Sequence, residues 1–492
     1  MNATPLDSSA PVASWRVGLL LFIAVLVLSL LQAALLPLLD RDEPRFAEAS
    51  REMLQSGNFI VPTFNNAPRY AKPPLIYWCQ AASFTLFGEN AFAARLPSLL
   101  ATAGTAWLLF FWCARLGQIQ IGFSAAVSYA LCFQTIQQGR VATADALLIF
   151  FMTLTAFVGW QIIRPRDTGR CSSWYCAILP LCWAGGFLAK GPEALLPFLP
   201  LLWCARGAGR AVLFRLVQSF IIGLALVLIW AMPAYVATHG DYWKVGLGHD
   251  VFDRAVGGNF QGHGASTVGW YLLSLPFYLL LFWLSALPWS PLLVIHRKKL
   301  FTAWKPDLID TYLLLNAGLI FLVFSLMATK LPHYTLPAFP FLALLFARRW
   351  NAVSLSPHHV TRLGWRMGTV FALVALVGIP IAIANNATPS PVGQLVRMAG
   401  SDLKPNTEYA FVDFQEPNTI WEMRRVSKNF GHSISANDRG DFMKLPGPRA
   451  VIFPTEIGIL HWVGPFNWKQ YEVRGFNAAK GKFIDLTLVV KP

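Results

Sequence analysis

The chain has 492 residues, of which 55% are hydrophobic and only 13% are charged. Soluble domains carry about 25% charged residues, so this composition excludes an ordinary soluble protein. None of the seven cysteines lies beyond Cys204 or in a CxxC pair, which excludes a disulfide framework and a thiolate metal site. In a soluble protein the net charge of +15 would indicate nucleic acid.

Long apolar stretches recur along the chain, and each is a candidate membrane span because a spanning helix needs about 20 apolar residues. We expect eleven of them: 17–39, 93–115, 119–138, 143–163, 174–189, 192–205, 211–236, 268–295, 311–328, 333–347 and 367–385. Prolines interrupt the pair over 174–205, which is either two short spans or a re-entrant pair. The sequence predicts a polytopic α-helical membrane protein with about 11–13 transmembrane helices, beginning with a retained helix.

Basic residues predict the orientation, since cytoplasmic loops carry an excess of Lys and Arg. With the N-terminus in the cytoplasm, the inside loops hold 15 basic residues, and Asp167 and Asp307 are the only clear acids among them. This bias explains much of the positive charge without a nucleic acid partner. The outside then has two large loops, 40–92 and 237–267, and we expect a transmembrane domain over 1–385 and an outer domain over 386–492.

Three segments outside the spans have informative patterns. Residues 43–56 carry apolar side chains at helical spacing before Gly57, which predicts an amphipathic helix on the membrane surface. Residues 73–88 are apolar but too short to span, so we expect a second interfacial helix. In the tail, β-like runs at 409–412, 450–453 and 484–490 and a helix-like stretch near 416–426 predict a small α/β domain.

Charged and histidine side chains gather where the expected spans meet the outer face. They are Asp42, Glu43, Arg45, Lys72, Arg140, Asp145, Lys190, His249, Asp250, Asp253, Arg254, His263, Lys330 and His333. Separate loops that meet at one depth predict one outward-facing cavity. Its carboxylates could bind a divalent cation or deprotonate a hydroxyl, and its lysines and arginines could hold phosphate oxygens. A membrane-level site with both favours a lipid-phosphate substrate.

Several of these residues also have a plain structural explanation. Lys190 and Arg140 lie near helix ends, where basic side chains often extend to the interface. Asp145 could cap the helix that it begins. His249 and His263 could be solvated loop histidines, and helix 43–56 could be a passive anchor. The joint placement of all the groups favours a site.

The motifs resemble those of bacterial aminoarabinose transferases. Asp42 to Leu54, Gly57 to Pro62 and Lys72 to Trp78 are similar to the first outer loop of that family. Further similar motifs follow in family order, and the resemblance covers about residues 15–350: Arg140 to Asp145, Ala189-Lys190-Gly191-Pro192, and Lys330-Leu331-Pro332-His333-Tyr334. These transferases belong with the protein O-mannosyltransferases to the GT-C glycosyltransferases, so the resemblance implies the GT-C fold.

The resemblance implies roles for the matched residues. Asp42 would be the principal acidic catalytic residue and Asp145 the second. Arg45 and Lys72 would contact the carrier phosphate. The carrier pocket would be lined by Lys330, His333 and Tyr334, and by their charge Lys190 and Arg254 join the phosphate-binding set. A divalent metal, zinc, would bind near Asp42 with a second-loop histidine, for which His249 is the candidate.

One position departs from the family pattern. The family usually has an acid directly before the Lys72-Pro73 pair, where this chain has Ala71. Glu43 is a candidate replacement and a third catalytic carboxylate, although adjacent helical residues point about 100° apart. An acceptor phosphate, which is already ionised, tolerates the loss of this acid better than an acceptor hydroxyl does.

We therefore expect an inner-membrane glycosyltransferase that moves a sugar from undecaprenyl phosphate to lipid A or a related envelope glycolipid at the periplasmic face. The sugar that the resemblance suggests is 4-amino-4-deoxy-L-arabinose, and we expect a monomer in contact with membrane lipids. The alternatives are a protein or polysaccharide glycosyltransferase of the same fold, a transporter of lipid-linked sugars, and a catalytically dead scaffold. A transporter would place its charges near the bilayer midplane, whereas these lie at the outer interface.

Overall fold

The computed structural model describes residues 10–39, 41–164, 173–246, 248, 268–302, 304–353, 357–374, 378, 381, 390–457, 468–477 and 481–492. The chain forms two compact units. The helical unit comprises Met1–Leu30, Tyr70–Ile76 and Leu96–Ala372, and the loop–tail unit comprises Leu31–Arg69, Tyr77–Arg95 and Leu373–Pro492. Most of the first outer loop therefore groups with the tail, which differs from a division at residues 385 and 386.

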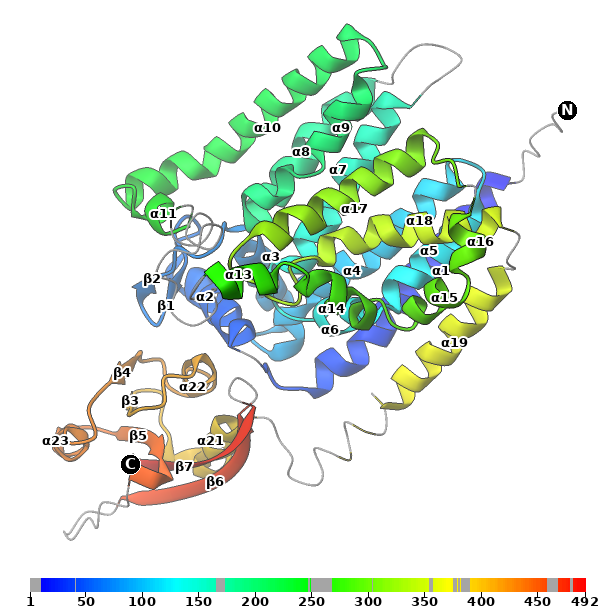
Figure 1. Cartoon of the computed structure of the whole chain (residues 1–492). Helices are drawn as coiled ribbons and strands as arrows, with labels where there is room; N and C mark the ends of the chain where they lie inside the picture. Colours follow the sequence, from blue (N-terminus) through cyan, green and yellow to red (C-terminus); the bar gives the residue numbers. More distant parts are fainter. Residues whose placement is uncertain are drawn as a thin grey trace, which may run out of the picture. The chain divides into compact units, whose positions relative to one another are not determined.

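The helical unit is built from helices and short 3-10 turns (Figure 1). Its helices are α1 (Ala10–Leu35), α4 (Ala91–Ala114), α5 (Ile119–Ala130), α6 (Phe133–Gln138), α7 (Asp145–Ile163), α8 (Ser173–Lys190), α9 (Phe198–Ala205), α10 (Arg210–Ala237), α11 (Asp241–Trp243), α13 (Val268–Ser274), α14 (Phe277–Ser285), α15 (Trp289–Ile295), α16 (Arg297–Phe301), α17 (Leu308–Leu326), α18 (Phe339–Ala352) and α19 (Pro357–Leu373). Turns η1 (Pro192–Leu195) and η3 (Leu336–Ala338) precede α9 and α18. The first residues of α4 and the last residues of α1 and α19 belong to the loop–tail unit.

Five helices of the described residues are long and apolar enough to cross a membrane: Trp15–Leu35 of α1, and α4, α7, α10 and α17. Gly269–Ser285 and Trp289–Ile295, bent by 101° at their break, give a sixth if they count as one span. The other predicted spans contain shorter or broken helices, and in the segment before α9 prolines cause the break. Pro192 and Pro197 divide the segment before α9, and a proline cannot donate the backbone hydrogen bond that continues a helix.

Helix α7 is the centre of the helical unit. It packs against α8, α9, α18 and both 3-10 turns. In its most apolar stretch 83% of the residues are buried, compared with 22% in the corresponding stretch of α10. Helices α7 and α8 approach closely at Gly185, where an added Cβ would lie 2.5 Å from the ring of Phe151. This close packing fixes the start of α7 relative to the end of α8.

The loop part of the loop–tail unit contains a helix, a hairpin and a second helix. Helix α2 (Asp42–Ser56) ends at Gly57, whose φ of 70° is the left-handed conformation that glycine adopts readily. Strands β1 (Thr63–Phe64) and β2 (Ala67–Pro68) are joined by Asn65 and Asn66, both at positive φ, as a two-residue hairpin turn requires. Helix α3 (Leu75–Phe87) follows. Both helices predicted for this loop are present.

The tail folds into a five-stranded sheet with strand order β4-β3-β5-β7-β6. Its elements are α21 (Pro391–Ala399), η5 (Gly400–Asp402), β3 (Glu408–Phe411), α22 (Pro417–Met423), β4 (Gly431–Ser433), α23 (Arg439–Lys444), β5 (Arg449–Pro454), η6 (Thr455–Ile457), β6 (Lys469–Asn477) and β7 (Lys482–Lys491). Strand β3 pairs in parallel with β4 and β5, and β7 pairs antiparallel with β5 and β6.

Helices cover both faces of this sheet. Tyr409 and Phe411 point to one core with Leu395 of α21 and Met423 of α22. Their neighbour Ala410 belongs to a second core, which also contains Met443 of α23. The alternation follows from the two-residue repeat of a strand. The predicted α/β tail domain is confirmed.

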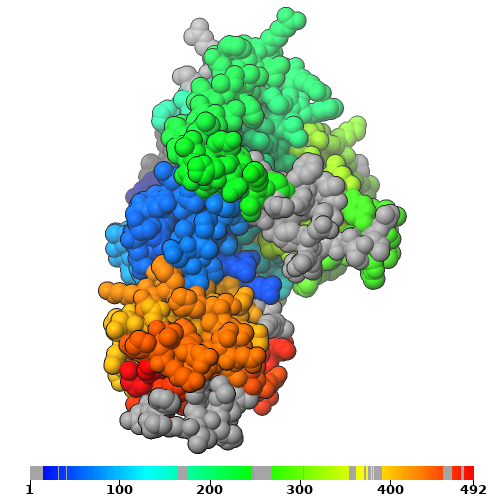
Figure 2. All heavy atoms as spheres, turned by 90° about the vertical axis from the view of Figure 1, so that its left-hand side faces the viewer, coloured from blue at the N-terminus to red at the C-terminus, as the bar shows by residue number. Residues whose placement is uncertain are grey.

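Helix α2 is more deeply buried than an amphipathic surface helix would be. Glu48, Arg51 and Glu52 are each at most 3% exposed. The helix packs against α22 of the tail, and Figure 2 shows the blue surface of the loop adjoining the orange surface of the tail. The polar side of α2 therefore faces protein.

Candidate functional site

Asp145 is the first residue of α7, where the helix dipole favours a negative charge. Its carboxylate accepts a hydrogen bond from Lys190 Nζ at 2.8 Å and one from Thr143 Oγ1 at 2.9 Å. The side chain does not cap α7, because the N-cap residue is Ala144 and no side chain caps this end. The plain capping explanation for Asp145 is therefore wrong.

Lys190 ends α8 and is buried, so it does not extend to the interface. Its ammonium lies 2.8 Å from Asp145 and 3.3 Å from Glu193, a carboxylate that the sequence did not single out. The same ammonium lies 5.3 Å from the centre of the Tyr334 ring, within the range of a cation–π contact. The structure thus brings together Asp145, Lys190 and Tyr334 from three predicted motifs.

Tyr334 and His333 lie in the turn between α17 and η3. Tyr334 is buried, and its ring lies 5.3 Å from the rings of both Phe324 and His333. The motif that begins at Lys330 therefore completes a buried polar cluster at the start of α7.

Lys330 has a different environment within the same motif. Its ammonium donates to the carbonyl oxygens of Ser325 and Met327, each at 2.7 Å, and so caps the C-terminal end of α17. It also lies about 6 Å from the rings of Tyr271 and Tyr278. Burial lowers the pKa of Lys330. This arrangement favours a structural role for the residue in the absence of a ligand.

Lys72 lies where the first outer loop meets the second. Its carbonyl oxygen accepts a hydrogen bond from the Tyr242 hydroxyl at 2.5 Å, and the rings of Tyr70 and Tyr242 are 5.3 Å apart. Tyr242 belongs to α11, at the start of the second loop. The backbone next to Ala71 is therefore joined to α11 by the hydrogen bond between Tyr242 and Lys72.

Asp42 and Arg45 lie on the first turn of α2. Their side chains are 54% and 39% exposed, and the carboxylate and guanidinium are 3.9 Å apart. Burial and the nearby Arg69 lower the pKa of Arg45. An accessible carboxylate and a guanidinium one turn apart could contact a sugar and a phosphate of the same ligand.

Glu43 is buried and holds the start of α2 in place. Both of its oxygens accept from Arg95, at 2.7 Å each. Arg95 also donates to the carbonyl oxygens of Ala33, Leu36 and Pro37 at the end of α1. These contacts favour a positioning role for Glu43. The signal for Arg95 in the sequence is a single charge among apolar residues.

The predicted site residues thus fall into two sets. Asp42, Glu43 and Arg45 belong to the loop–tail unit. The helical unit contains the other described candidates, which are Lys72, Arg140, Asp145, Lys190, Lys330, His333 and Tyr334. The single cavity stays a prediction. His249, Asp250, Asp253, Arg254 and His263 lie outside the described residues.

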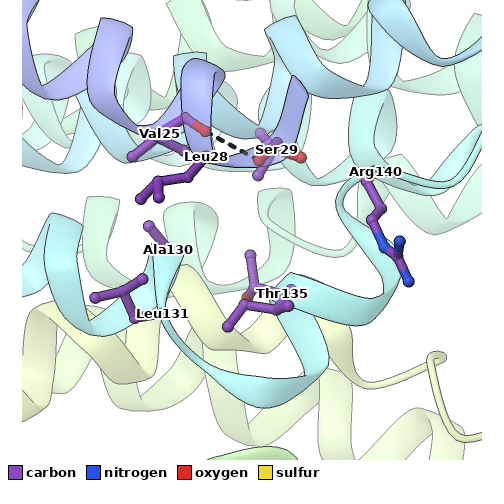
Figure 3. A pocket seen from close by; sticks show the side chains of 9 residues that line it. Val25, Leu28, Ser29, Ala130, Leu131, Thr135 and Arg140 are labelled. Carbon is purple, nitrogen blue, oxygen red and sulfur yellow. Dashed lines mark hydrogen bonds between the residues drawn. The ribbon is translucent and has the colours of Figure 1, made fainter. Parts of the chain in front are cut away.

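Arg140 lines a mostly apolar pocket of the helical unit (Figure 3). The other lining residues are Val25, Leu28, Ser29, Thr102, Ala130, Leu131, Thr135 and Ile136. The guanidinium lies 3.4 Å from the Gln137 side-chain oxygen. Arg140 therefore lies at the edge of this pocket, whereas Asp145, in the same motif, pairs with Lys190.

Metal binding needs several convergent ligands, and the part of the chain that the structure describes contains no group of three His, Cys, Asp or Glu side chains placed to hold a metal. Asp42 has an arginine as its ion-pair partner. The described residues therefore do not fit a zinc site by themselves, and the suggested ligand His249 lies outside them. Zinc binding stays a prediction.

Residues 71–236 match the family described as dolichyl-phosphate-mannose-protein mannosyltransferase. The chain is 31% identical over 383 residues to undecaprenyl phosphate-alpha-4-amino-4-deoxy-L-arabinose arabinosyl transferase 2 of Pseudomonas fluorescens. These residues are 74% of this chain and 65% of that relative. The undecaprenyl phosphate-alpha-4-amino-4-deoxy-L-arabinose arabinosyl transferase of Pseudomonas aeruginosa is 31% identical over 351 residues, which are 68% of this chain and 61% of that relative. The matched region is thus less than two thirds of these relatives' length.

Solved structures agree in fold. ArnT from Cupriavidus metallidurans bound to undecaprenyl phosphate has a TM-score of 0.72 and 17% sequence identity, covering 96% of this chain and 98% of that one. Its apo state gives a TM-score of 0.71. The chain therefore has the GT-C fold of polytopic membrane proteins. Within that class it belongs to the aminoarabinose-transferase-like family, and the predicted resemblance is confirmed.

Proposed function

We propose that this protein is a membrane glycosyltransferase that moves a sugar from an undecaprenyl phosphate donor to lipid A or a related envelope glycolipid. The observation that supports it most is the 383-residue match to a protein named as an undecaprenyl phosphate-aminoarabinose arabinosyl transferase. An accessible Asp42–Arg45 pair and a buried Asp145–Lys190 pair lie in the matched motifs. The sugar in this proposal is 4-amino-4-deoxy-L-arabinose.

The chemistry of the transfer suits these side chains. An acceptor oxygen forms a bond to the anomeric carbon of the sugar while the bond from that carbon to the donor phosphate oxygen breaks. Undecaprenyl phosphate leaves with the electron pair, and cations such as Arg45 and Lys72 would stabilise its charge. Positive charge develops on the sugar, which a carboxylate such as Asp42 would stabilise.

An acceptor phosphate is the proposed nucleophile because it needs no general base. An acceptor hydroxyl must lose a proton, and the chain has Ala71 where the family usually has an acid. The match of residues 71–236 to the protein mannosyltransferase family supports a protein acceptor as the second candidate. A transfer assay that offers both acceptors separates these candidates.

Location and metal content complete the proposal. An inner-membrane protein with a cytoplasmic N-terminus and a periplasmic tail is supported by the basic residues of the loops. A reporter enzyme that is active only in the periplasm should be active when it is fused after residue 492. Zinc near Asp42 with His249 is part of the proposal, and elemental analysis of the purified protein tests it.

The decisive experiment is transfer by the purified protein in lipid nanodiscs. Undecaprenyl phosphate-linked aminoarabinose is supplied with lipid A or with a protein acceptor, and products are identified by mass spectrometry. We expect lipid A to gain one aminoarabinose. Asp42→Asn should reduce turnover by about 1000-fold, whereas Asp241→Asn, a matched change at another exposed aspartate, should not. Full activity of Asp42→Asn would remove that residue from the mechanism.

A further inference from the structure

A buried cluster of charges joins α2 to the tail within the loop–tail unit. Arg424, the residue that follows α22, pairs with Glu48 of α2 and lies 3.2 Å from Glu52. It also donates to the Gln55 side chain at 2.9 Å. One arginine of the tail therefore contacts three consecutive turns of a helix that lies about 370 residues earlier in the chain.

Arg51 makes the reverse connection, from α2 to the tail. It donates to Glu48 at 2.9 Å and to the Trp421 carbonyl oxygen at 3.1 Å, and its guanidinium lies 3.8 Å from the centre of the Trp421 ring. None of the side chains of Glu48, Glu52, Arg51 and Arg424 is more than 4% exposed, and Arg51 also pairs with the partly exposed Glu89 at 3.0 Å. A buried network of paired charges of this kind fixes geometry.

The hairpin of the first outer loop is tied into the same cluster. Glu52 accepts from the hydroxyl of Thr63 and from the backbone N–H of Asn65, each at 2.6 Å. The Asn65 side chain then exchanges two hydrogen bonds of 2.8 Å with the backbone of Gly431, on edge strand β4. The loop is therefore held to the tail at both the helix and the hairpin.

The two ends of α2 differ in a way that matters for chemistry. Its middle, from Phe46 to Met53, is buried, while its first turn exposes Asp42 and leaves Arg45 partly exposed. A rigid helix transmits the position of Glu48 to Asp42, which lies less than two turns away. We propose that Arg424 is a positioning residue, through which the tail domain sets the place of the Asp42 carboxylate; this rests on the function proposed above.

Variants of Arg424 in the full-length protein test this role. Arg424→Leu should lower kcat by about 10- to 100-fold and leave KM for the undecaprenyl phosphate donor within about twofold, because a displaced carboxylate weakens the chemical step. Arg424→Lys keeps the charge and should recover part of the lost kcat. Arg425→Leu is the matched control. The Arg425 side chain is next to Arg424 in the chain but is 52% exposed, and among the described contacts it pairs only with Glu422.

Hydrogen exchange gives a readout that does not need activity. In Arg424→Leu the amides of α2 should exchange at least about tenfold faster than in Arg425→Leu. If the unmodified protein transfers no sugar but Arg424→Leu loosens α2, the proposed function fails and the connection between tail and helix stands. Equal kcat and equal α2 exchange in Arg424→Leu and Arg425→Leu would overturn the positioning role.

Discussion

The buried Lys190 side chain forms ion pairs with two carboxylates, those of Asp145 and Glu193. Removing one partner of a buried ion pair leaves an uncompensated charge, which costs about 3–5 kcal/mol. Arg95 has the same character, because it holds Glu43 and three carbonyl oxygens at the end of α1. Charged residues in apolar surroundings are here the points that fix helices to each other.

We expect Lys190→Met to lower the free energy of unfolding by about 3–5 kcal/mol, because two carboxylates lose their cation. Lys244→Met should cost less than about 1 kcal/mol, since the Lys244–Asp241 pair is exposed. Denaturant titration in detergent micelles measures both. Equal losses for the two variants would show that the buried pair adds no more than a surface pair.

Sequence alone could mark Lys190 and Asp145 as misplaced charges, but it could not pair them with each other or with Glu193. Pairing depends on the antiparallel packing of α7 and α8, which Gly185 permits through its missing side chain. Asp42 was more accessible to prediction, because an acid directly after an apolar helix is conspicuous without any partner. Arg95 was missed because one charge did not interrupt a predicted span.

Lys330 shows how a helix end can use a residue that also suits a ligand. Helix α17 ends at Leu326, and its last carbonyl groups have no partner within the helix. The Lys330 ammonium supplies donors to two of the oxygens in this region, and a cation at this end also suits the helix dipole. Binding a carrier phosphate would require those hydrogen bonds to be given up.

Lys330→Met should therefore destabilise the protein by about 1–3 kcal/mol and change KM for the donor by less than about twofold. Lys305→Met, at an exposed position before the other end of α17, provides the control for stability. Unfolding titrations and donor-dependent rates give the two quantities. A tenfold rise in KM without a loss of stability would return Lys330 to the carrier-phosphate role.

Local patterns predicted the helices and strands well where the physical cause is local. The α2 and α3 segments end at glycines, and the β-like runs of the tail became β3, β5 and β7. The burial of α2 was not predictable in this way. Its partner Arg424 is far away in sequence, and an amphipathic pattern does not distinguish a helix on a membrane from one covered by protein.

The grouping of the chain gives the tail a specific structural task. The loop–tail unit is assembled from Leu31–Arg69, Tyr77–Arg95 and Leu373–Pro492, so the loop with Asp42 folds as part of the same body as the sheet. Its segments are joined by the buried cluster and by the Asn65–Gly431 hydrogen bonds. Without the tail, Glu48 and Glu52 would lose Arg424, and Arg51 would lose Trp421.

A chain that ends at residue 385 should consequently expose Arg51. In the full-length protein Arg51 has a side chain with 0% exposure and lies within a buried helix, so trypsin should not cut there. In the shortened chain we expect cleavage after Arg51 to be at least about tenfold faster. The residues that cover it are gone, so the free energy of local unfolding is lower. Mass spectrometry of timed digests in nanodiscs identifies the fragments.

Lys244, whose side chain is 74% exposed, should be cut at the same rate in both chains and serves as the internal control. Continued protection of Arg51 in the shortened chain would mean that α2 is held by contacts other than those with the tail.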